Sequence, residues 1–444
     1  MLVCLLLAFG TTSCGGHSQS FVPPSNAASA NASFGVAYEP PQGKLPSPIQ
    51  HVVIIFQENR TPDYLFQGVA GADISKTATD SKGDKVSLHE VSLAAPYDLG
   101  HSHQSFVQDY DGGKLDGFDH NQRIQDHLHP YGYAPRSEVQ PYLDMASRYV
   151  FADHMFQSNQ GPSFPAHLYI VSGTATQPSI GAYRVSDNPI DRATLKSAGG
   201  GCDARPTVVV NTVEISDGSA GPRPYPCFDR PVLSDFLDAK KVSWRFYQQE
   251  LGPGLWHPFD AIRHVRNSPE YANVVTPPQT VLTDIANGHL AGMSWVMPDG
   301  KHSDHAGSAS AEGPSWVAAV VNAVGKSKYW NSTAIFVAWD DWGGWYDHVP
   351  PPIFNHYELG FRVPLLVISP YAKRGYVSKV QHEFASILVF AEQTFGIPRG
   401  SLDSTDTRAD DLMDAFDFTQ KPRPFVPIDA PPFRPANGPN AEDP

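Results

Sequence analysis

Runs of apolar, β-forming residues alternate along the chain with stretches of helical periodicity. The predicted strands are short and almost wholly apolar, as buried strands are. They cover residues 51–56, 149–152, 243–247, 293–297, 333–339 and 363–368. The predicted helices cover residues 141–149, 163–172, 231–239, 315–324 and 384–395. This alternation predicts an α/β fold with a mostly parallel central sheet and helices on both faces.

The predicted strand at 333–339 ends in a sequence that suits a ligand site. Two adjacent carboxylates, Asp340 and Asp341, follow it, and the pair Gly343-Gly344 then permits a turn. Ligands of open α/β sheets bind beyond the carboxyl ends of the strands. Two anions placed there repel each other, so a metal ion between them is the simplest partner. A solvated acidic turn is the alternative interpretation of the pair.

Two further polar signals fall at comparable places. Glu58 and Asn59 follow the first strand, and Ser163 opens a helix at an N-cap position, with Pro165 in the first turn. In a wound sheet these places lie along one edge and can meet. Together they offer oxygen ligands for a divalent cation and a hydroxyl that can act as a nucleophile.

The N-terminal region predicts export. The apolar run 2–9 has the length of a signal-peptide core, and residues 1–14 are predicted to form a signal peptide. Small residues before Cys14 resemble a bacterial lipoprotein signal, in which that cysteine is lipidated. Residues 15–48, rich in Ser, Ala, Asn, Pro and Gly, are predicted to form a flexible linker. The protein is therefore expected to be periplasmic, attached to the cell surface or secreted.

Two cysteines remain in the body of the chain. Cys202 and Cys227 flank a segment rich in Gly, Pro and Asp, and an oxidising compartment would allow them to form a disulfide. The surrounding residues 175–230 are predicted to be a loop-rich insertion beside the site, in which 207–215 forms a hairpin with the residues after it. Residues 421–444 form a Pro-rich tail, so the main domain is expected to cover 49–420.

The charge of the chain narrows its expected partners. The chain has 32 Lys and Arg against 46 Asp and Glu, a net charge of −14, and no long basic run. This balance argues against a nucleic-acid surface and against strong binding to anionic membranes. Contact with a membrane is expected only through a lipid anchor on Cys14.

The chain shares an ordered set of motifs with one protein family. The first motif is His51-Val52-Val53-Ile54-Ile55-Phe56-Gln57-Glu58-Asn59-Arg60-Thr61. Seven further motifs occur in the expected order: Asp98 to His101, Gly161-Pro162-Ser163-Phe164-Pro165, Cys227-Phe228-Asp229, His257-Pro258-Phe259, Ser303-Asp304-His305, Asp340 to Val349, and Arg362-Val363-Pro364. From about residue 49 to 400 the chain thus resembles the bacterial phosphoesterase family. That family contains phosphocholine-hydrolysing phospholipases C and an acid phosphatase branch, on an alkaline-phosphatase-like core.

The resemblance implies roles for particular residues. One divalent metal ion, whose identity the sequence does not reveal, would be held by Glu58, Asn59, Ser163, Asp340 and Asp341, with Ser163 as the nucleophile. Positions that contact the phosphate or the leaving group correspond to His101, His257 and His305. Asp347 and His348 are expected either to support these residues or to contact the substrate. His382 also falls in a segment like that of the family.

The leading hypothesis is an exported, metal-dependent phosphoesterase that works through a phosphoserine on Ser163. Family phospholipases C generally carry Thr at the nucleophile position, so Ser163 resembles the acid phosphatase branch and favours phosphomonoesters. The substrate would be the phosphate ester of a small molecule or a phospholipid head group. A phospholipase C that cleaves phosphocholine-type diesters is the first alternative. A non-catalytic surface binding protein on the same fold is the second.

Overall fold

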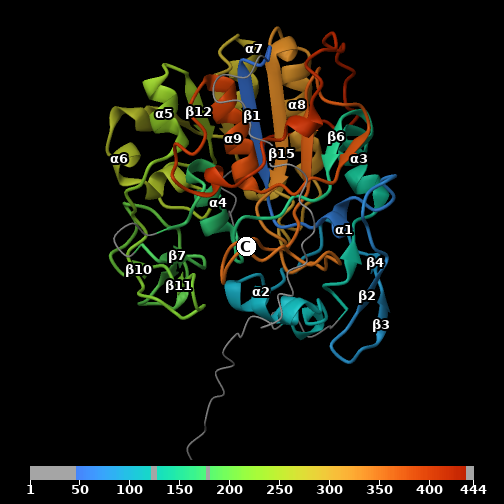
Figure 1. The fold of residues 1–444 in the computed structure, drawn as a ribbon, viewed down its shortest axis with the longest axis vertical. Helices are drawn as coiled ribbons and strands as arrows, with labels where there is room; N and C mark the ends of the chain where they lie inside the picture. The colour runs from blue at the N-terminus through green and yellow to red at the C-terminus, as the bar shows by residue number, and fades with distance from the viewer. Residues whose placement is uncertain (1–46, 122–127, 177–180, 437–444) are drawn as a thin grey trace, which may run out of the picture. The chain divides into compact units, whose positions relative to one another are not determined.

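An eight-stranded sheet forms the centre of the protein in the computed structural model, which describes residues 47–121, 128–176 and 181–436 (Figure 1). The strands lie in the order β13 (Val274–Val275), β12 (Trp244–Tyr247), β14 (Met293–Val296), β1 (His51–Gln57), β15 (Thr333–Trp339), β16 (Leu365–Ile368), β6 (Val150–Ala152) and β17 (Tyr376–Ser378). Neighbouring strands are parallel except where β16 runs antiparallel to both β15 and β6. The predicted mostly parallel sheet is therefore confirmed.

Helices cover both faces of this sheet. Phe336 and Trp339 lie on opposite faces of β15, because side chains alternate along a strand. The Phe336 ring packs against Phe390 of α9 (Phe384–Phe395), with the ring centres 5.1 Å apart. The Trp339 ring packs against Tyr142 of α3 (Arg136–Arg148), with the ring centres 5.0 Å apart. Helix α4 (Ser163–Ser172) contacts α9 and α5 (Leu233–Ala239), whereas α8 (Gly313–Gly325) contacts α3 and α7 (Thr280–Ala286).

The structure corrects one predicted element and extends another. The helix predicted at 141–149 begins at Arg136, so that Pro141 lies inside it rather than in its first turn. The segment 207–215 forms the predicted hairpin with the residues after it, since Val213 makes an antiparallel bridge with Ala220 and the Gly221 amide donates to the Thr212 carbonyl (2.8 Å). It also pairs with residues that precede it, which was not predicted. Within it, β10 (Val208–Val209) pairs with β8 (Ile190–Asp191), and β11 (Thr212–Glu214) pairs with β7 (Tyr183–Val185). These strands have only two or three residues, too few to show which partner they select.

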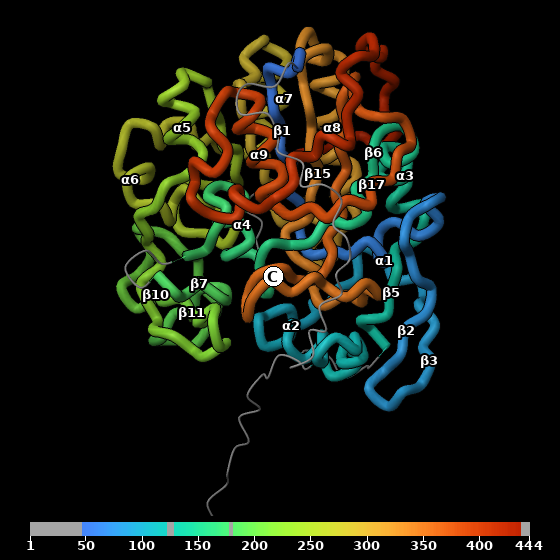
Figure 2. Tube along the Cα trace, viewed as in Figure 1, coloured from blue at the N-terminus to red at the C-terminus, as the bar shows by residue number. Residues whose placement is uncertain are grey.

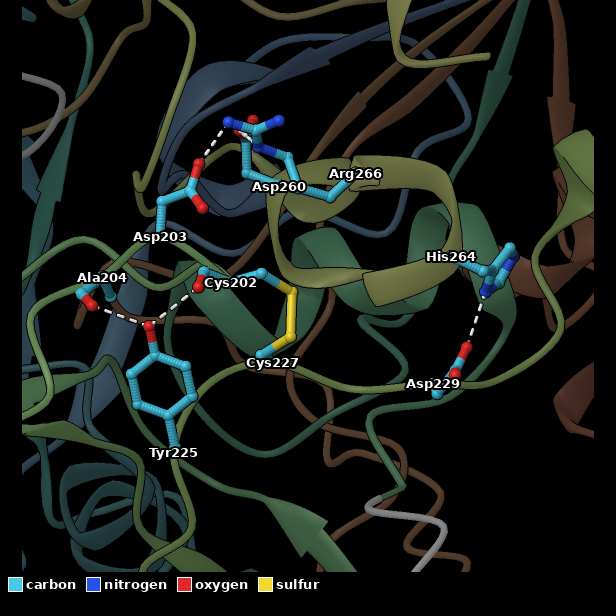
Figure 3. The surroundings of a disulfide bond; sticks show 9 residues. All are labelled: Cys202, Asp203, Ala204, Tyr225, Cys227, Asp229, Asp260, His264 and Arg266. Atoms are coloured by element: carbon cyan, nitrogen blue, oxygen red, sulfur yellow. Dashed lines mark hydrogen bonds and ion pairs between the residues drawn. A yellow bond between two sulfur atoms is a disulfide. The ribbon is translucent and has the colours of Figure 1, made fainter. Parts of the chain in front are cut away.

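Cys202 and Cys227 form a disulfide inside the segment 175–230 (Figure 3). The Cys202 amide donates a hydrogen bond to the Asp260 carbonyl (2.8 Å), and the Phe228 amide donates one to the Ala261 carbonyl (2.7 Å). Both carbonyls belong to the short helix Pro258–Ala261, which directly follows His257. The disulfide thus closes a loop whose two ends are bonded to the segment that carries a predicted site histidine.

The two ends of the chain differ in what the structure describes. The predicted signal peptide, the lipidation site at Cys14 and nearly all of the 15–48 linker lie outside the described residues. Within the described ranges, no helix has the length and apolar character needed to cross a membrane. Residues 421–436 form neither helix nor strand, but the Phe425 ring packs on Trp330 and the Phe433 ring packs on Trp316. This part of the tail is therefore bound to the main domain.

Candidate active site

Strand register brings the two predicted acidic segments together. Strands β1 and β15 are parallel neighbours, and Gln57 pairs with Trp339 at their last positions. Glu58-Asn59 and Asp340-Asp341 therefore leave the sheet side by side. The Asn59 amide donates a hydrogen bond to Asp340 Oδ1 (2.9 Å), and all four side chains are buried.

A turn at Gly343-Gly344 holds this region against its neighbours. Gly343 has φ of +63°, and a Cβ at this position would lie 2.5 Å from the Asn59 carbonyl oxygen. Gly344 has φ of +73°, and a Cβ there would lie 2.6 Å from Leu99 Cβ. Only glycine combines this left-handed backbone with such close approach. The turn consequently packs directly on the segments that carry Asn59 and His101.

Ser163 meets the acidic residues from the other side. It is the first residue of α4, and Pro162, not Ser163, occupies the N-cap position. The Ser163 hydroxyl is therefore not used as a helix cap. Its Oγ lies 3.1 Å from Glu58 Oε2 and 3.5 Å from Asp341 Oδ2. The hydroxyl thus points into the group of carboxylates.

The electrostatics of this group favour a cation. Burial, followed by the charges of Asp340 and Asp341, raises the pKa of Glu58 well above its usual range. Among the described residues, Asp340 Oδ2 has no hydrogen-bond donor although it is buried. Buried carboxylate oxygens normally have partners, so the carboxylates of Glu58, Asp340 and Asp341 together suit a divalent ion that favours oxygen ligands.

The Asn59 side chain connects the carboxylates to two histidines. With the amide turned so that its nitrogen faces the carboxylates, that nitrogen lies 3.1 Å from Asp340 Oδ1 and 3.0 Å from Glu58 Oε2. The amide oxygen then lies 3.1 Å from His101 Nε2 and 3.2 Å from His305 Nε2. Both imidazoles are fixed by their other nitrogen, which donates to the carbonyl of Leu99 or Ala306. Their Nε2 atoms therefore face the same point beside the carboxylates.

The remaining predicted residues lie in different surroundings. His257 is buried, with its Nδ1 bonded to the Gly252 carbonyl (2.8 Å), and its charge contributes to lowering the pKa of a second buried histidine, His167.

Asp347 forms a two-bond ion pair with buried Arg362 (2.8 and 3.0 Å). His348 bridges two other carboxylates, of Asp63 (2.7 Å) and Asp73 (3.0 Å). Asp347 and His348 thus form part of an ion-pair network, and their supporting role stays a prediction.

His382, which lies in a family-like segment, belongs to a third group. Its Nδ1 is 2.7 Å from Asp410 Oδ1, and its Nε2 is 3.1 Å from Ser378 Oγ. Ser378 ends β17, three strands away from β15 in the sheet. Among the described contacts of His382, none joins it to Ser163 or to the four strand-end residues.

A comparison with models of protein families finds a match over most of the chain. A model of the phosphoesterase family matches residues 49–398, a range that contains every residue of this site. The chain belongs to the phosphoesterase family.

Curated relatives of this phosphoesterase are similar over most of its length. A non-hemolytic phospholipase C of Pseudomonas aeruginosa is 25% identical over 445 residues, covering 85% of this chain and 59% of the relative. Phospholipase C A of Mycobacterium tuberculosis is 24% identical, covering 85% of this chain and 79% of the relative. This chain spans between 55% and 59% of the length of the first three relatives. A solved alkaline phosphatase superfamily protein of Vibrio parahaemolyticus aligns with a TM-score of 0.40 at 10% identity, covering 86% of this chain and 76% of that protein.

One residue of this phosphoesterase site, His167, was not predicted from the sequence. His167 follows Ser163 by one helical turn on α4, and its Nε2 lies 2.9 Å from Glu58 Oε1. Burial, followed by the charge of His257, lowers the pKa of His167 well below its usual range, so the ring is neutral. Towards an ionised Glu58, which can only accept, the ring donates from Nε2. The spacing of four residues from Ser163 is the only sequence signal for it, because the surrounding helix is otherwise a buried apolar segment.

Proposed function

We propose that this protein is an exported, metal-dependent phosphoesterase that forms a phosphoserine intermediate on Ser163. The observation that carries the proposal is the position of the Ser163 hydroxyl. It contacts Glu58 at the point where two parallel strands end in carboxylates, opposite the Nε2 atoms of His101 and His305. The disulfide between Cys202 and Cys227 supports export, because disulfides persist in oxidising compartments.

The buried oxygens fit one divalent cation. Its ligands would be Glu58, Asp340, Asp341 and Ser163, and Asn59 would join them if its amide turned to present its oxygen. When bound, the cation would offset the repulsion among the carboxylates and polarise both the serine hydroxyl and a phosphoryl oxygen. The oxygen-rich ligand set favours a hard cation, and it does not distinguish among the first-row metals.

The chain's own residues would account for binding and proton transfer. The Ser163 hydroxyl donates to Glu58 Oε2, so this carboxylate can take the hydroxyl proton as the serine oxygen attacks phosphorus. His101 and His305 each carry a proton on Nδ1, because that atom faces a carbonyl. When doubly protonated, their Nε2–H groups donate to phosphoryl oxygens, and one of them can protonate the leaving alcohol. Water then hydrolyses the phosphoserine and restores the hydroxyl.

A phospholipase C activity is the second candidate, and the curated relatives favour it. The relatives that match this chain at 24% and 25% identity are named as phospholipases C. The geometry around Ser163 suits attack on either a phosphomonoester or a phosphodiester. Substrate comparison is therefore needed to choose between the two reactions.

Two chromogenic substrates provide the test. We expect the metal-loaded protein to hydrolyse p-nitrophenyl phosphate faster than p-nitrophenylphosphorylcholine. Ser163→Ala should lose at least about a thousandfold in kcat, because nucleophile removal leaves only binding and electrostatic effects. Ser147→Ala, an exposed change on α3, is the matched control and should retain full turnover. Acid-quenched wild type should carry one phosphate on Ser163, detected by mass spectrometry of the peptides.

Each result has a distinct meaning. A preference for the choline diester would replace the monoesterase with a phospholipase C. Full turnover by Ser163→Ala would contradict the phosphoserine mechanism. No turnover of either ester by metal-loaded wild type would favour a binding protein on this fold.

A further inference from the structure

A polar cavity of about 480 Å³ lies beside the proposed nucleophile. Its lining includes His101, which faces the phosphate position, and Pro162, which directly precedes Ser163. Cavities of this size accommodate small organic ligands. A phosphate ester bound at Ser163 would therefore extend its organic group into this space.

One wall of the cavity is formed by α2 (His103–Tyr110) and its N-cap Ser102. Gln104 and Gln108 are four residues apart and so project from the same face of the helix, with Ser105 beside them. Within the described residues, neither glutamine side chain has a hydrogen-bond partner. The wall thus presents two amides that are available to a ligand.

The opposite wall comes from the 175–230 segment, which lies beside α2 in the Cα trace (Figure 2). Asp187 accepts hydrogen bonds from the His103 amide (3.0 Å) and from the side chain of Asn211 (3.4 Å). Asn188 Oδ1 accepts one from the amide of Phe164 (2.9 Å), the residue after Ser163. This segment is therefore bonded both to α2 and to the start of α4, which fixes the cavity beside the nucleophile.

The chemistry of the lining excludes two common kinds of substrate group. Among the described residues that line the cavity there is no Lys or Arg to bind a second phosphate, and no Phe, Tyr or Trp to enclose a quaternary ammonium. Asp187, the one carboxylate among these described lining residues, already accepts hydrogen bonds from His103 and Asn211. Apart from Asp187 and the imidazole of His101, the polar side chains of the lining are hydroxyls and amides.

We propose that this cavity binds an uncharged, hydroxyl-rich group, and that the substrates are phosphate esters of sugars or polyols. Ser, Gln and Asn side chains are the partners that sugar hydroxyls need, since each hydroxyl both donates and accepts. This inference rests on the proposed phosphoesterase function. It adds the class of alcohol, which the geometry around Ser163 alone does not specify.

The test compares kcat/KM for four esters. These are myo-inositol 1-phosphate, phosphatidylinositol in vesicles, p-nitrophenyl phosphate and p-nitrophenylphosphorylcholine. The first two carry the same polyol as a free ester and as a lipid, so they distinguish the two sources of the group. We expect at least one inositol ester to exceed the choline ester at least about tenfold, as two or more hydrogen bonds would give.

Variants of the α2 wall locate the effect. Gln104→Met and Gln108→Met keep the length of the side chain and the helix, but remove the amide. Each should reduce the ratio of inositol-ester to p-nitrophenyl phosphate kcat/KM about fivefold. Gln279→Met, at the start of α7, is the control and should leave that ratio unchanged.

The outcomes separate this inference from the proposed function. A choline ester that matches the better inositol ester, or unchanged ratios in both α2 variants, would overturn the inference while leaving the phosphoesterase intact. If no ester is hydrolysed, the proposed function fails, and the cavity is then judged by calorimetric titration with inositol 1-phosphate and with inorganic phosphate. Tighter binding of the inositol ester, weakened in Gln104→Met, would still support the cavity, whereas equal binding would overturn it.

Discussion

Two hydrogen bonds from buried side chains hold the Glu58 carboxylate in position. His167 donates to Glu58 Oε1, and the Ser163 hydroxyl donates to Oε2, so both carboxylate oxygens are held by residues of one helix. Donors on both oxygens fix the rotation of the carboxylate as well as its location. The first turn of α4 thus supplies the proposed nucleophile and also orients a proposed metal ligand. Metal ligands are commonly oriented by hydrogen bonds from neighbouring residues in this way.

His348 allows a stability prediction at the level of one residue. Burial lowers its pKa, but the hydrogen bond to Asp63 and the charges of Asp63 and Asp347 outweigh burial and raise the pKa to about 9. The folded value lies above the usual 6.5, so the stabilisation is complete below pH 6.5 and is lost as pH rises through 9. His348→Gln should therefore lower the free energy of unfolding by ~2 kcal/mol at pH 6 and by much less at pH 10.

Urea denaturation at the two pH values checks this prediction. The quantity to compare is the difference between wild type and variant, because other groups also titrate over this range. The exposed His289 provides the control, since His289→Gln should produce a small difference at both pH values. A loss for His348→Gln that is as large at pH 10 as at pH 6 would show that packing, not charge, accounts for the effect.

At the level of elements, the turn after β15 joins the two halves of the site. Gly343→Ala should impair the site because its Cβ would be forced against the Asn59 carbonyl. Gly112 has the same φ of +63° but nothing within 4 Å of an added Cβ, so Gly112→Ala is a matched control. Both variants should lose about 1 kcal/mol of stability through backbone strain. Only Gly343→Ala should also lose metal binding and p-nitrophenyl phosphate hydrolysis, by about tenfold or more.

Measured kcat and metal affinity, set beside unfolding free energies, separate the two effects. Equal activities in the two alanine variants would mean that the contact with Asn59 does not matter for the site.

The same elements show what sequence reasoning can reach. Strands β1 and β15 are long apolar runs with abrupt polar ends, so Glu58, Asn59, Asp340 and Asp341 could be located from local pattern alone. Their adjacency followed from the rule that ligands gather at the carboxyl edge of a parallel sheet. His167 could not be found in this way, because it lies inside a buried apolar helix and not at the end of a strand. The pairing of 207–215 with the following residues was predicted, whereas its pairing with β7 and β8 was missed, because strands of two or three residues carry almost no periodic signal.

At the scale of the whole molecule, the carboxylate group should couple stability to the metal. Without a cation, the folded chain keeps Glu58, Asp340 and Asp341 buried together, an arrangement that raises the pKa of Glu58 and opposes folding near neutral pH. A cation that binds only the folded state stabilises it by about 3–4 kcal/mol at 100 to 1,000 times its dissociation constant. For a chain of this size, that corresponds to a rise in Tm of about 3–5 °C.

Asp340→Asn tests this coupling while preserving the local backbone. Asp340 Oδ1 accepts hydrogen bonds from the Asn59 and Asp341 amides, and an asparagine oxygen can accept both. The variant removes one buried charge, so its Tm in chelator should exceed that of chelated wild type. It should also lose most of the rise on adding the metal, whereas Asp144→Asn on α3 should keep the full rise. Equal Tm values for chelated and metal-loaded wild type would contradict a metal site here, because a ligand that binds the folded state must stabilise it.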